Sequence, residues 1–361
     1  VGISFIVPNV LKAKRMAEYV RTHYPETKII LGSYGTVIPD LKKIVPHDEA
    51  CKGEGVHWLR NYFGNDVNAP VKHPAIHGPA FEYLYGFKGP GKGAILMTGL
   101  GCNNACKFCM TSHMFEKKYV SLLPTGKDVY DACEHTEKKL GSRGFSIMDE
   151  NFLKKPDRAR ELLEEMTLNN KPYVFDIFSS AEVIKQMGID FLVRLGIRMV
   201  WIGVESKKNS HEKTKGIDLH ALIDELQASG IVVNASAILF QDHHDEKTLK
   251  EDIDWTISLG SNLTQFMNYT PYPTTALYDE YKVEGRLKDI HFRHHHGAGE
   301  LVFEHNHLPD RKVHARYLRD AFRKKYETDG PGVLNMALTA IRGYGKAERD
   351  YIERQEKGLV W

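Results

Sequence analysis

Three of the five cysteines of this chain lie close together in the sequence. Cys102, Cys106 and Cys109 have the spacing C-x3-C-x2-C and directly follow the short run Gly99-Leu100-Gly101. Thiolates in one short loop are ligands for zinc or for an iron–sulfur cluster, and an odd number of cysteines in a chain of this size does not indicate a disulfide framework. The expected chemistry is therefore metal chemistry in a reducing, intracellular setting.

The number of available ligands separates the two kinds of metal site. A structural zinc ion needs a fourth cysteine or histidine at comparable spacing, and neither Cys51 nor Cys133 forms a second C-x-x-C pair. His113 follows Cys109 by four residues, so a zinc site of three cysteines and one histidine stays open. Three thiolates on a [4Fe–4S] cluster instead leave one iron free, which an amine and a carboxylate of a bound molecule can chelate.

A regular series of strand-like runs is expected to position this loop. Apart from a longer first gap that holds the cysteines, the runs recur roughly every 30 residues, with helical patterns between them, and this is the rhythm of βα units. Six units in series predict an α/β fold, a parallel barrel or its open form, with active residues at the carboxyl ends of the strands. The runs are residues 94–99, 144–149, 173–178, 198–204, 231–238 and 263–269.

The flanking parts have a different character. Residues 1–60 read as the end of an α/β unit, with strands at 1–7 and 28–31 and a helix at 11–23, so we expect the chain to begin within a domain. Residues 61–92 carry four prolines and predict a linker. The barrel is expected over 93–280 and a helix-rich carboxy-terminal extension over 281–361, where 310–327 and 349–356 are the clearest charged helical stretches.

Composition narrows the class of protein. The 361 residues include 49 Lys and Arg against 47 Asp and Glu, a formal charge of +2 that does not favour nucleic acid as a partner. Hydrophobic residues make up 42% and charged residues 27%, as in globular proteins, and no apolar run reaches the roughly 18 residues of a membrane span. We therefore expect a cytoplasmic protein without a transmembrane segment.

The cysteine loop also carries a family resemblance. C-x3-C-x2-C with an aromatic residue, Phe108, before the third cysteine resembles the signature of the radical S-adenosylmethionine superfamily. The resemblance covers residues 93–275 and implies a partial (β/α)6 barrel whose [4Fe–4S] cluster is held by Cys102, Cys106 and Cys109. It further implies that the open iron binds S-adenosylmethionine, that reductive cleavage gives a 5′-deoxyadenosyl radical, and that a reducing donor such as flavodoxin or ferredoxin supplies the electron.

The resemblance extends to residues at the strand ends. Asp149 and Glu150 open a D-E-N-F segment similar to those that bond the methionyl ammonium, a good partner for carboxylates, although this segment could also cap the following helix. Glu205 lies in an I-G-V-E-S stretch similar to one whose glutamate lies near S-adenosylmethionine; a solvated strand-end acid is the alternative. Ser179, after the third strand, could reach the same cavity.

Two further segments resemble the cobalamin-associated branch of this superfamily. Tyr269 begins a stretch similar to its T-P-Y-P-G-T-x-L segment, with Thr274 where glycine is usual. In the amino-terminal part, Ser4 with Ile6 and Gly32 with Ser33 resemble the S-x-L and G-G segments of cobalamin-binding Rossmann-like domains, where small residues let a flat ligand approach the backbone. Ser33 replaces the second glycine of that pattern. A truncated α/β domain without a ligand is the alternative.

Two histidine-containing segments are not part of the motifs that carry the resemblance. Residues 242–245, Asp-His-His-Asp, follow the fifth strand and could supply an acid, a base or a ligand, although a polar loop is favoured. Residues 294–296 are three consecutive histidines, which cannot all face one ion on a helix or strand, so a solvated loop is expected.

The resemblance as a whole implies a class B radical S-adenosylmethionine methyltransferase. Such an enzyme transfers methyl through cobalamin to an unactivated carbon of a small-molecule or lipid-like substrate. Cobalamin-associated cyclisation or rearrangement, and a non-methylating enzyme with an empty first domain, are alternatives. A non-catalytic zinc or iron–sulfur module is disfavoured because it has no need of Asp149, Glu150 and Glu205 at strand ends.

Overall fold

The computed structural model describes residues 1–361 except 79–82, 85–86, 89–91, 151, 209–213 and 357–361. Its main element is a seven-stranded sheet in the order β14-β13-β12-β11-β10-β7-β4. Six of these strands are parallel and follow one another in chain order, and β4 pairs antiparallel with β7 at one edge. The strands are β4 (Ile76–His77), β7 (Gly93–Leu96), β10 (Gly144–Ile147), β11 (Val174–Ser179), β12 (Ile197–Glu205), β13 (Val232–Leu239) and β14 (Leu263–Asn268).

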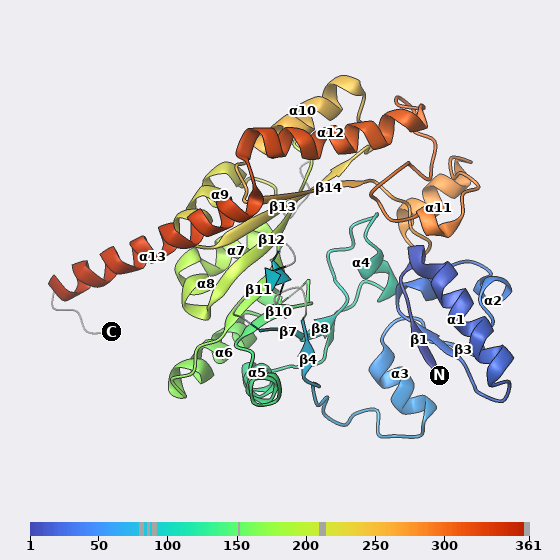
Figure 1. Cartoon of the computed structure of the whole chain (residues 1–361), viewed down its shortest axis with the longest axis horizontal. Coiled ribbons are helices and arrows are strands. Elements are labelled where there is room, and N and C mark those ends of the chain that lie inside the picture. Colours follow the sequence, from blue (N-terminus) through green and yellow to red (C-terminus); the bar gives the residue numbers. More distant parts are fainter. Residues whose placement is uncertain (79–82, 85–86, 89–91, 151, 209–213, 357–361) are drawn as a thin grey trace.

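Helices between the strands cover one side of this sheet (Figure 1). Two of them begin with reciprocal capping boxes, Thr125 with Asp128 on α5 and Asp245 with Thr248 on α10, which satisfy backbone N–H groups at the helix starts. The helices are α5 (Gly126–Leu140), α6 (Pro156–Leu168), α7 (Ala181–Met187), α8 (Ile189–Leu195), α9 (Leu219–Ala228) and α10 (Glu246–Ser258).

The core between sheet and helices explains the strand patterns. Residues such as Phe145, Phe175 and Val200 point from successive strands toward the helices and are fully buried. Because side chains alternate across a strand, their neighbours point to the opposite face, where Phe178 and Trp201 lie. The helix-covered face thus forms the core, and the other face is left for a site.

A smaller parallel sheet, in the order β1-β2-β3, forms the amino-terminal part. Its apolar residues and those of α1 form a second hydrophobic cluster, separate from the main core. Helix α3 begins at the cap residue Glu54, whose carboxylate accepts from two backbone N–H groups. The elements are β1 (Gly2–Ser4), α1 (Val10–His23), β2 (Ile30–Gly32), α2 (Leu41–Ile44), β3 (Glu49–Ala50) and α3 (Gly55–Tyr62).

The cysteine loop lies between the two sheets. It follows the short strand β8 (Gly99–Leu100), which pairs with β9 (Val120–Ser121), and it leads into the five-residue helix α4 (Met110–Met114). Figure 1 shows α4 beside the amino-terminal part. Between β4 and β7 in the chain, the short strands β5 (Tyr83–Leu84) and β6 (Phe87–Lys88) pair antiparallel with each other.

Three helices follow the main sheet: α11 (Ala276–Val283), α12 (Arg311–Asp329) and α13 (Gly332–Glu356). Helix α13 crosses the amino end of β13 at a pair of glycines, and a Cβ atom on Gly343 would lie only 2.4 Å from the Cα atom of Gly230. Beyond this crossing, α13 extends past the sheet on the side opposite the amino-terminal part (Figure 1).

The expected elements can be compared with those observed. All six expected strands of the main sheet are present, within a few residues of their predicted ends, and so are the helix near 11–23 and the helix near 310–327. Helix α13 begins at Gly332, well before the expected stretch at 349–356. Among the helices of the described part of the chain, none combines the length and apolar character that crossing a membrane requires.

Candidate functional site

A cavity of about 210 Å³ lies between the cysteine loop and the carboxyl ends of the main strands. The loop enters it through Gly101, whose φ of +83° and whose contact with the Lys118 carbonyl, 2.3 Å from a would-be Cβ atom, leave room for glycine only. The lining residues come from the loop and from four strand ends. They are Cys102, Asn104, Cys106, Phe108, Cys109, Ser112, Glu150, Phe178, Ser179, Ser180, Trp201, Gly203, Glu205 and Ser236.

All three cysteines of the loop line this cavity and are free thiols. Cys102 is buried, and Cys106 and Cys109 are half-buried. Burial raises the pKa of the Cys109 thiol, while backbone N–H groups of Ser112 and Thr111, at the start of α4, bond to its sulfur and favour the thiolate. Three convergent sulfur ligands therefore face one cavity, as the sequence predicted.

The arrangement does not resemble a compact zinc site. Ligand sulfurs on tetrahedral zinc lie about 3.8 Å apart, given a Zn–S distance of about 2.3 Å. Within the part of the chain that the structure describes, no set of three or more ligand atoms including these cysteines lies within 4.8 Å; the one such group is His243, His244 and Asp252. His113 Nε2 lies 3.2 Å from the Cys106 carbonyl oxygen, to which it donates a hydrogen bond.

Two carboxylates reach the cavity beside the cysteines. Glu150 accepts a hydrogen bond from the Thr111 hydroxyl at 3.2 Å; its side chain is open to solvent through the cavity, yet surrounding protein atoms raise the pKa of its carboxyl group. Glu205 ends β12 and is only 5% exposed. Ser179, at the end of β11, lies between them in the lining. These three residues thus lie where the sequence placed them.

Glu205 has an unusual backbone. Its φ is +58°, and the pairing of β12 with β13 shifts register between Gly203 and Glu205, which marks a bulge. A non-glycine residue in the left-handed region costs about 1–2 kcal/mol. Strain of this kind persists only where surrounding contacts hold it.

Asp149 does not line the cavity, contrary to expectation. Its Oδ2 atom accepts hydrogen bonds from Thr98 Oγ1 at 2.6 Å, from Tyr119 at 2.6 Å and from Arg158 Nη2 at 3.1 Å. Both side chains of the Asp149–Arg158 pair are almost completely buried, at 0% and 1% exposure. The expectation that Asp149 contacts S-adenosylmethionine is therefore corrected: it is half of a buried ion pair beneath the site. Asn151 of the same motif lies outside the described residues.

An aromatic residue precedes the third cysteine and packs against a second one. Phe108 lines the cavity and packs edge-on against Tyr269, with ring centroids 5.8 Å apart. Tyr269 is buried behind Phe108, and so supports the lining without belonging to it. Helix α11 fixes the loop from outside, because Leu277 N–H donates to the Lys107 carbonyl and Lys107 pairs with Glu280 at 3.0 Å.

The floor of the cavity contains a stacked aromatic pair that sequence reasoning missed. Phe178 and Trp201 have ring centroids 5.2 Å apart and an interplanar angle of 28°. They lie opposite each other on the neighbouring strands β11 and β12. The available signal was their position near the ends of predicted strands, on the face away from the core: Phe178 is the last residue of the run 173–178, and Trp201 lies three residues before the end of the run 198–204.

A second, larger cavity of about 620 Å³ lies between the two sheets. Ser4, Gly32 and Ser33 line it, as expected from the sequence, whereas Ile6 is 47% exposed and does not, which corrects that expectation. We call this cavity the slot. Its other lining residues are Val1, Gly2, Ile3, Ile30, Leu31, Tyr34, Cys51, Gly53, Gly55, Leu59, Phe63, Met97, Leu100, Met114 and Phe115.

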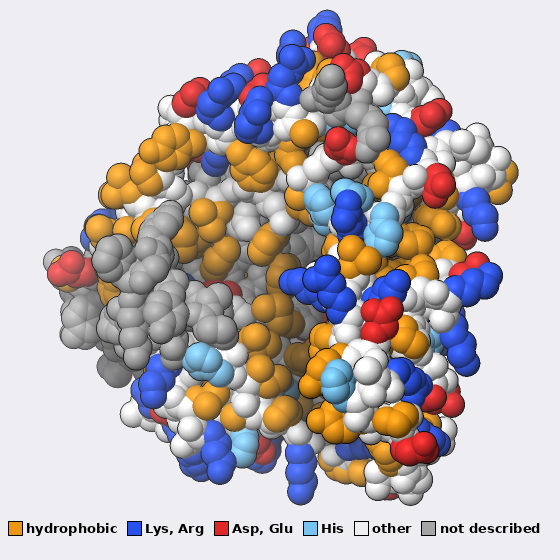
Figure 2. Space-filling model, turned by 45° about the vertical axis from the view of Figure 1, so that its right-hand side comes forward, with side chains coloured by type: hydrophobic (Ala, Val, Ile, Leu, Met, Phe, Trp, Pro, Cys, Tyr) orange, Lys and Arg blue, Asp and Glu red, His pale blue; other side chains and the backbone are white. Residues whose placement is uncertain are grey.

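The slot suits a large, flat, mainly apolar group. Its amino-terminal wall runs along the whole of β1 and β2, where a Cβ atom on Gly2 or Gly32 would meet nothing within 4 Å. Its opposite wall is apolar, with Met97, Leu100 and Phe115. The space-filling view shows a recess in this side of the molecule with hydrophobic side chains along its walls (Figure 2).

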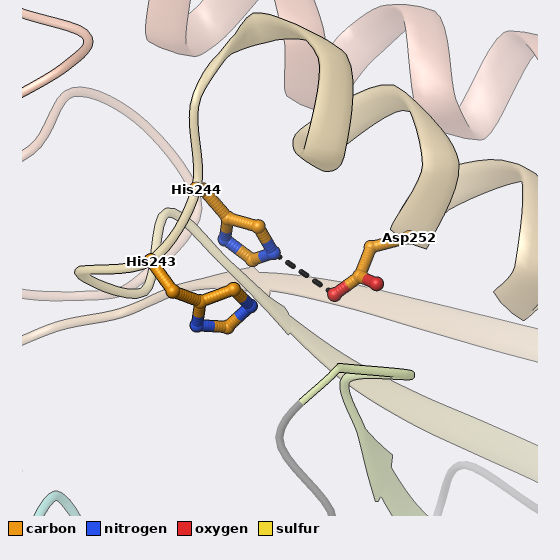
Figure 3. A group of neighbouring side chains, drawn as sticks. All are labelled: His243, His244 and Asp252. Atoms are coloured by element: carbon orange, nitrogen blue, oxygen red, sulfur yellow. Dashed lines mark hydrogen bonds and ion pairs between the residues drawn. The ribbon is translucent and has the colours of Figure 1, made fainter.

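The two histidine segments differ from the expected solvated loops. His295 is 4% exposed and packs against Phe292, with ring centroids 5.0 Å apart, so only part of segment 294–296 is solvated. In segment 242–245, Asp242 accepts from Tyr281 at 2.6 Å and pairs with Arg286 at 2.7 Å, and His244 is fully buried. His243 and His244 lie beside Asp252 (Figure 3).

Comparison with models of known protein families and with characterised protein sequences gives no match. Solved structures do match. One is the radical S-adenosylmethionine methyltransferase TsrM from Kitasatospora setae with cobalamin and a [4Fe–4S] cluster bound, with a TM-score of 0.59 and 15% identity over 79% of this chain and 64% of that one. The same enzyme with tryptophan substrate and the analogue aza-SAM matches with a TM-score of 0.61 and 15% identity, over 79% and 65%.

These matches concern the fold. The present chain is similar to TsrM in its α/β architecture with a largely parallel sheet, and it spans just under two thirds of the length of those chains.

Proposed function

We propose that this chain is a radical S-adenosylmethionine enzyme of the cobalamin-binding branch. The observation that carries the proposal is the first cavity: three free cysteines, Glu150, Ser179 and Glu205 converge there, at the carboxyl ends of parallel strands laid out in chain order as in a partial barrel. The fold shared with TsrM supports the same assignment.

In this proposal each residue of the cavity has a task. Cys102, Cys106 and Cys109 hold three irons of a [4Fe–4S] cluster, which supplies the electron for cleaving a C–S bond of S-adenosylmethionine. Glu150 receives the methionyl ammonium, and its hydrogen bond from Thr111 keeps the carboxylate turned toward the cavity. Glu205 and Ser179 bond ribose or ammonium groups.

The slot would hold cobalamin. Ser4, Gly32 and Ser33 would hold it, because their small side chains let a flat ring approach the backbone, and the apolar wall of the slot would keep water away from the bound cofactor. The slot and the cysteine cavity share one wall, because residues 97–115 contribute to both. Two cofactors on opposite sides of one short segment suit a reaction that uses both.

The reaction we propose is cobalamin-dependent transfer of a methyl group to an unactivated carbon of a small-molecule or lipid-like substrate. TsrM, with the same fold, is a methyltransferase crystallised with tryptophan, and this favours methyl transfer over rearrangement. An external reducing donor, such as flavodoxin or ferredoxin, would supply the electron.

The cluster is tested by anaerobic reconstitution with iron and sulfide. Wild-type protein should take up about four irons per chain and absorb near about 400 nm. Replacing Cys102, Cys106 or Cys109 with alanine should abolish this uptake, whereas Cys133→Ala, on the buried face of α5, should leave it unchanged. One bound zinc and no iron would contradict the proposal.

Cobalamin binding is tested separately with hydroxocobalamin and gel filtration. Gly32→Phe should fill the slot and abolish co-elution while leaving the iron content unchanged, and Ile6→Phe, outside the slot, should have no effect. Methyl transfer is tested by the products formed with reductant and S-adenosylmethionine. Both 5′-deoxyadenosine and S-adenosylhomocysteine are expected, and deoxyadenosine alone from cobalamin-loaded protein would indicate rearrangement.

A further inference from the structure

A hydrogen-bonded network lies directly behind Glu205, outside the cavity. Ser206 is 4% exposed, and its hydroxyl oxygen lies 3.3 Å from His243 Nε2. The same side chain is hydrogen-bonded to the carboxylate of Asp252, on helix α10. The residue next to Glu205 is thereby tied to a helix of the outer layer.

The donor of each hydrogen bond in this network can be assigned, because the outermost groups can only donate or only accept. The Gln241 backbone N–H donates to His244 Nδ1 at 2.9 Å, so in the neutral ring His244 Nε2 carries the proton and donates to Asp252 Oδ2, also at 2.9 Å (Figure 3). Asp252 can only accept, so the Ser206 hydroxyl donates to it and in turn accepts from His243 Nε2.

This assignment argues against a metal ion among these three side chains. A histidine binds metal through an unprotonated nitrogen, and both His244 nitrogens are occupied by hydrogen bonds. Asp252 also needs no metal to be ionised. Burial opposes its charge, but the bonds from His244 and Ser206 hold the pKa of the carboxyl group below its ordinary value. The network is complete as it stands.

What the network restrains is the strained turn at Glu205. Glu205 has a φ of +58° at a bulge, and its side chain lines the cavity while the following side chain, Ser206, points to the network. Buried, fully satisfied polar networks hold backbone rigidly, because a lost bond leaves a buried polar group with fewer partners at low dielectric. Release of Ser206 would let the bulge relax and turn the carboxylate away from the cavity.

We infer that Ser206 and Asp252 are positioning residues, which hold Glu205 in the orientation that binds S-adenosylmethionine. The identity of the bound ligand, S-adenosylmethionine, depends on the function proposed above. The restraint on the backbone of Glu205 does not depend on that function. Neither residue lines the cavity, so each acts through Glu205.

The first test measures the binding of S-adenosylmethionine to anaerobically reconstituted protein by isothermal titration calorimetry. Ser206→Ala and Asp252→Asn should each weaken binding about tenfold, the typical contribution of one charge-assisted hydrogen bond. Asp245→Ala is the matched control, because it removes the cap of the same helix α10 without touching Ser206, and it should leave the affinity unchanged. Equal weakening by Asp245→Ala would overturn the inference in favour of general destabilisation of α10.

A double-mutant cycle tests whether Ser206 affects the binding of S-adenosylmethionine through Glu205. Glu205→Gln should weaken binding, and Ser206→Ala added to it should cause no further loss, because the group that Ser206 positions is already disabled. Additive losses would show that Ser206 acts independently of Glu205 and would overturn the inference.

The restraint itself can be measured without any ligand. Hydrogen exchange of the backbone amides of residues 204–208 in the apoprotein should become at least about tenfold faster in Ser206→Ala and stay unchanged in Asp245→Ala. Unchanged exchange in Ser206→Ala would overturn the inference. A wild-type protein that binds no S-adenosylmethionine but shows the faster exchange in Ser206→Ala would refute the proposed function alone.

Discussion

The phenol oxygen of Tyr34 lies 3.0 Å from the hydroxyl oxygen of Thr111. Thr111 donates its own proton to Glu150, so Tyr34 must be the donor of the shared bond. Tyr34 lines the slot and Glu150 lines the cysteine cavity, and the three residues therefore connect the two cavities across the wall between them. Burial raises the pKa of Tyr34 to about 12, which keeps the phenol protonated and able to donate.

Tyr34→Phe removes this bond and keeps the ring in the slot. The expected loss is about 0.5–1.5 kcal/mol of unfolding free energy, measured by urea denaturation. Thr111→Val should cost more, because it also removes the bond to Glu150, and the double variant should cost little more than Thr111→Val alone, because both changes delete the Tyr34–Thr111 contact. Tyr19→Phe, on the exposed side of α1, is the control and should leave the urea midpoint in place. Full additivity of the two losses would contradict the bridge.

Asp149 should matter for stability far more than for ligand binding. Asp149→Asn leaves the buried Arg158 guanidinium without a counter-charge, and removing one partner of a buried pair costs about 3–5 kcal/mol. The measurement is the free energy of unfolding in urea. Asp157→Asn removes the exposed partner of Arg160 and should leave the midpoint unchanged. An Asp149→Asn protein of normal stability that no longer binds S-adenosylmethionine would restore the role first expected from the sequence.

Stability should fall as the pH drops from about 6.5 toward about 4. His305 is 2% exposed; its Nδ1 accepts from the His307 backbone N–H and its Nε2 donates to the Gln241 carbonyl. Burial lowers the pKa of His305 to about 4 from an ordinary 6.5. In that window the unfolded chain binds the proton and the folded chain does not, so stability is full above pH 6.5 and declines below it. The slope is at most about 1.4 kcal/mol per pH unit for each such histidine.

His305→Gln tests this assignment, because glutamine can still donate to the Gln241 carbonyl but does not titrate. Urea midpoints between pH 4.5 and pH 7.5 should decline less steeply in the variant, by about one histidine's share. His295, also buried with its pKa lowered to about 4, accounts for part of the remaining slope. An unchanged slope in His305→Gln would contradict the assignment.

The crossing of α13 over Gly230 should tolerate no side chain. A Cβ atom on Gly343 would lie 2.4 Å from the Gly230 Cα atom, whereas one on Gly345 would meet only the end of Arg349 at 3.5 Å. Gly343→Ala should therefore lower the thermal midpoint by several degrees, as overpacking costs about 1–3 kcal/mol. Gly345→Ala should raise it slightly, because alanine favours a helix by up to about 1 kcal/mol over glycine. Equal responses would contradict the close approach.

The sequence was informative wherever spacing alone decides the structure. The strand rhythm predicted the parallel strands, and the cysteine spacing predicted three thiols on one loop at a strand end. Two departures from the family pattern have a backbone conformation that favours glycine: Ser33 and Thr274 stand where glycine is usual, and both have positive φ, at 68° and 76°. The sequence alone did not reveal this conformation, because the residue that would signal it is replaced.

The expectations from the sequence were wrong where the role of a residue depends on the direction in which its side chain points. Asp149 and Glu150 are neighbours at a strand end, and neighbouring side chains leave a strand on opposite sides. Glu150 consequently faces the cavity and Asp149 the interior, which the motif could not distinguish. Contacts between segments distant in the sequence could not be predicted either. Met114 and Phe115 line the slot together with Ser4 only because α4 lies against the amino-terminal sheet.

Residues 97–115 form the wall shared by the slot and the cysteine cavity, and this stretch contains all three loop thiols. Oxidation of those thiols would alter a segment that bounds both cavities. Damage at Cys102, Cys106 or Cys109 would therefore also affect the slot, although none of these thiols lines it.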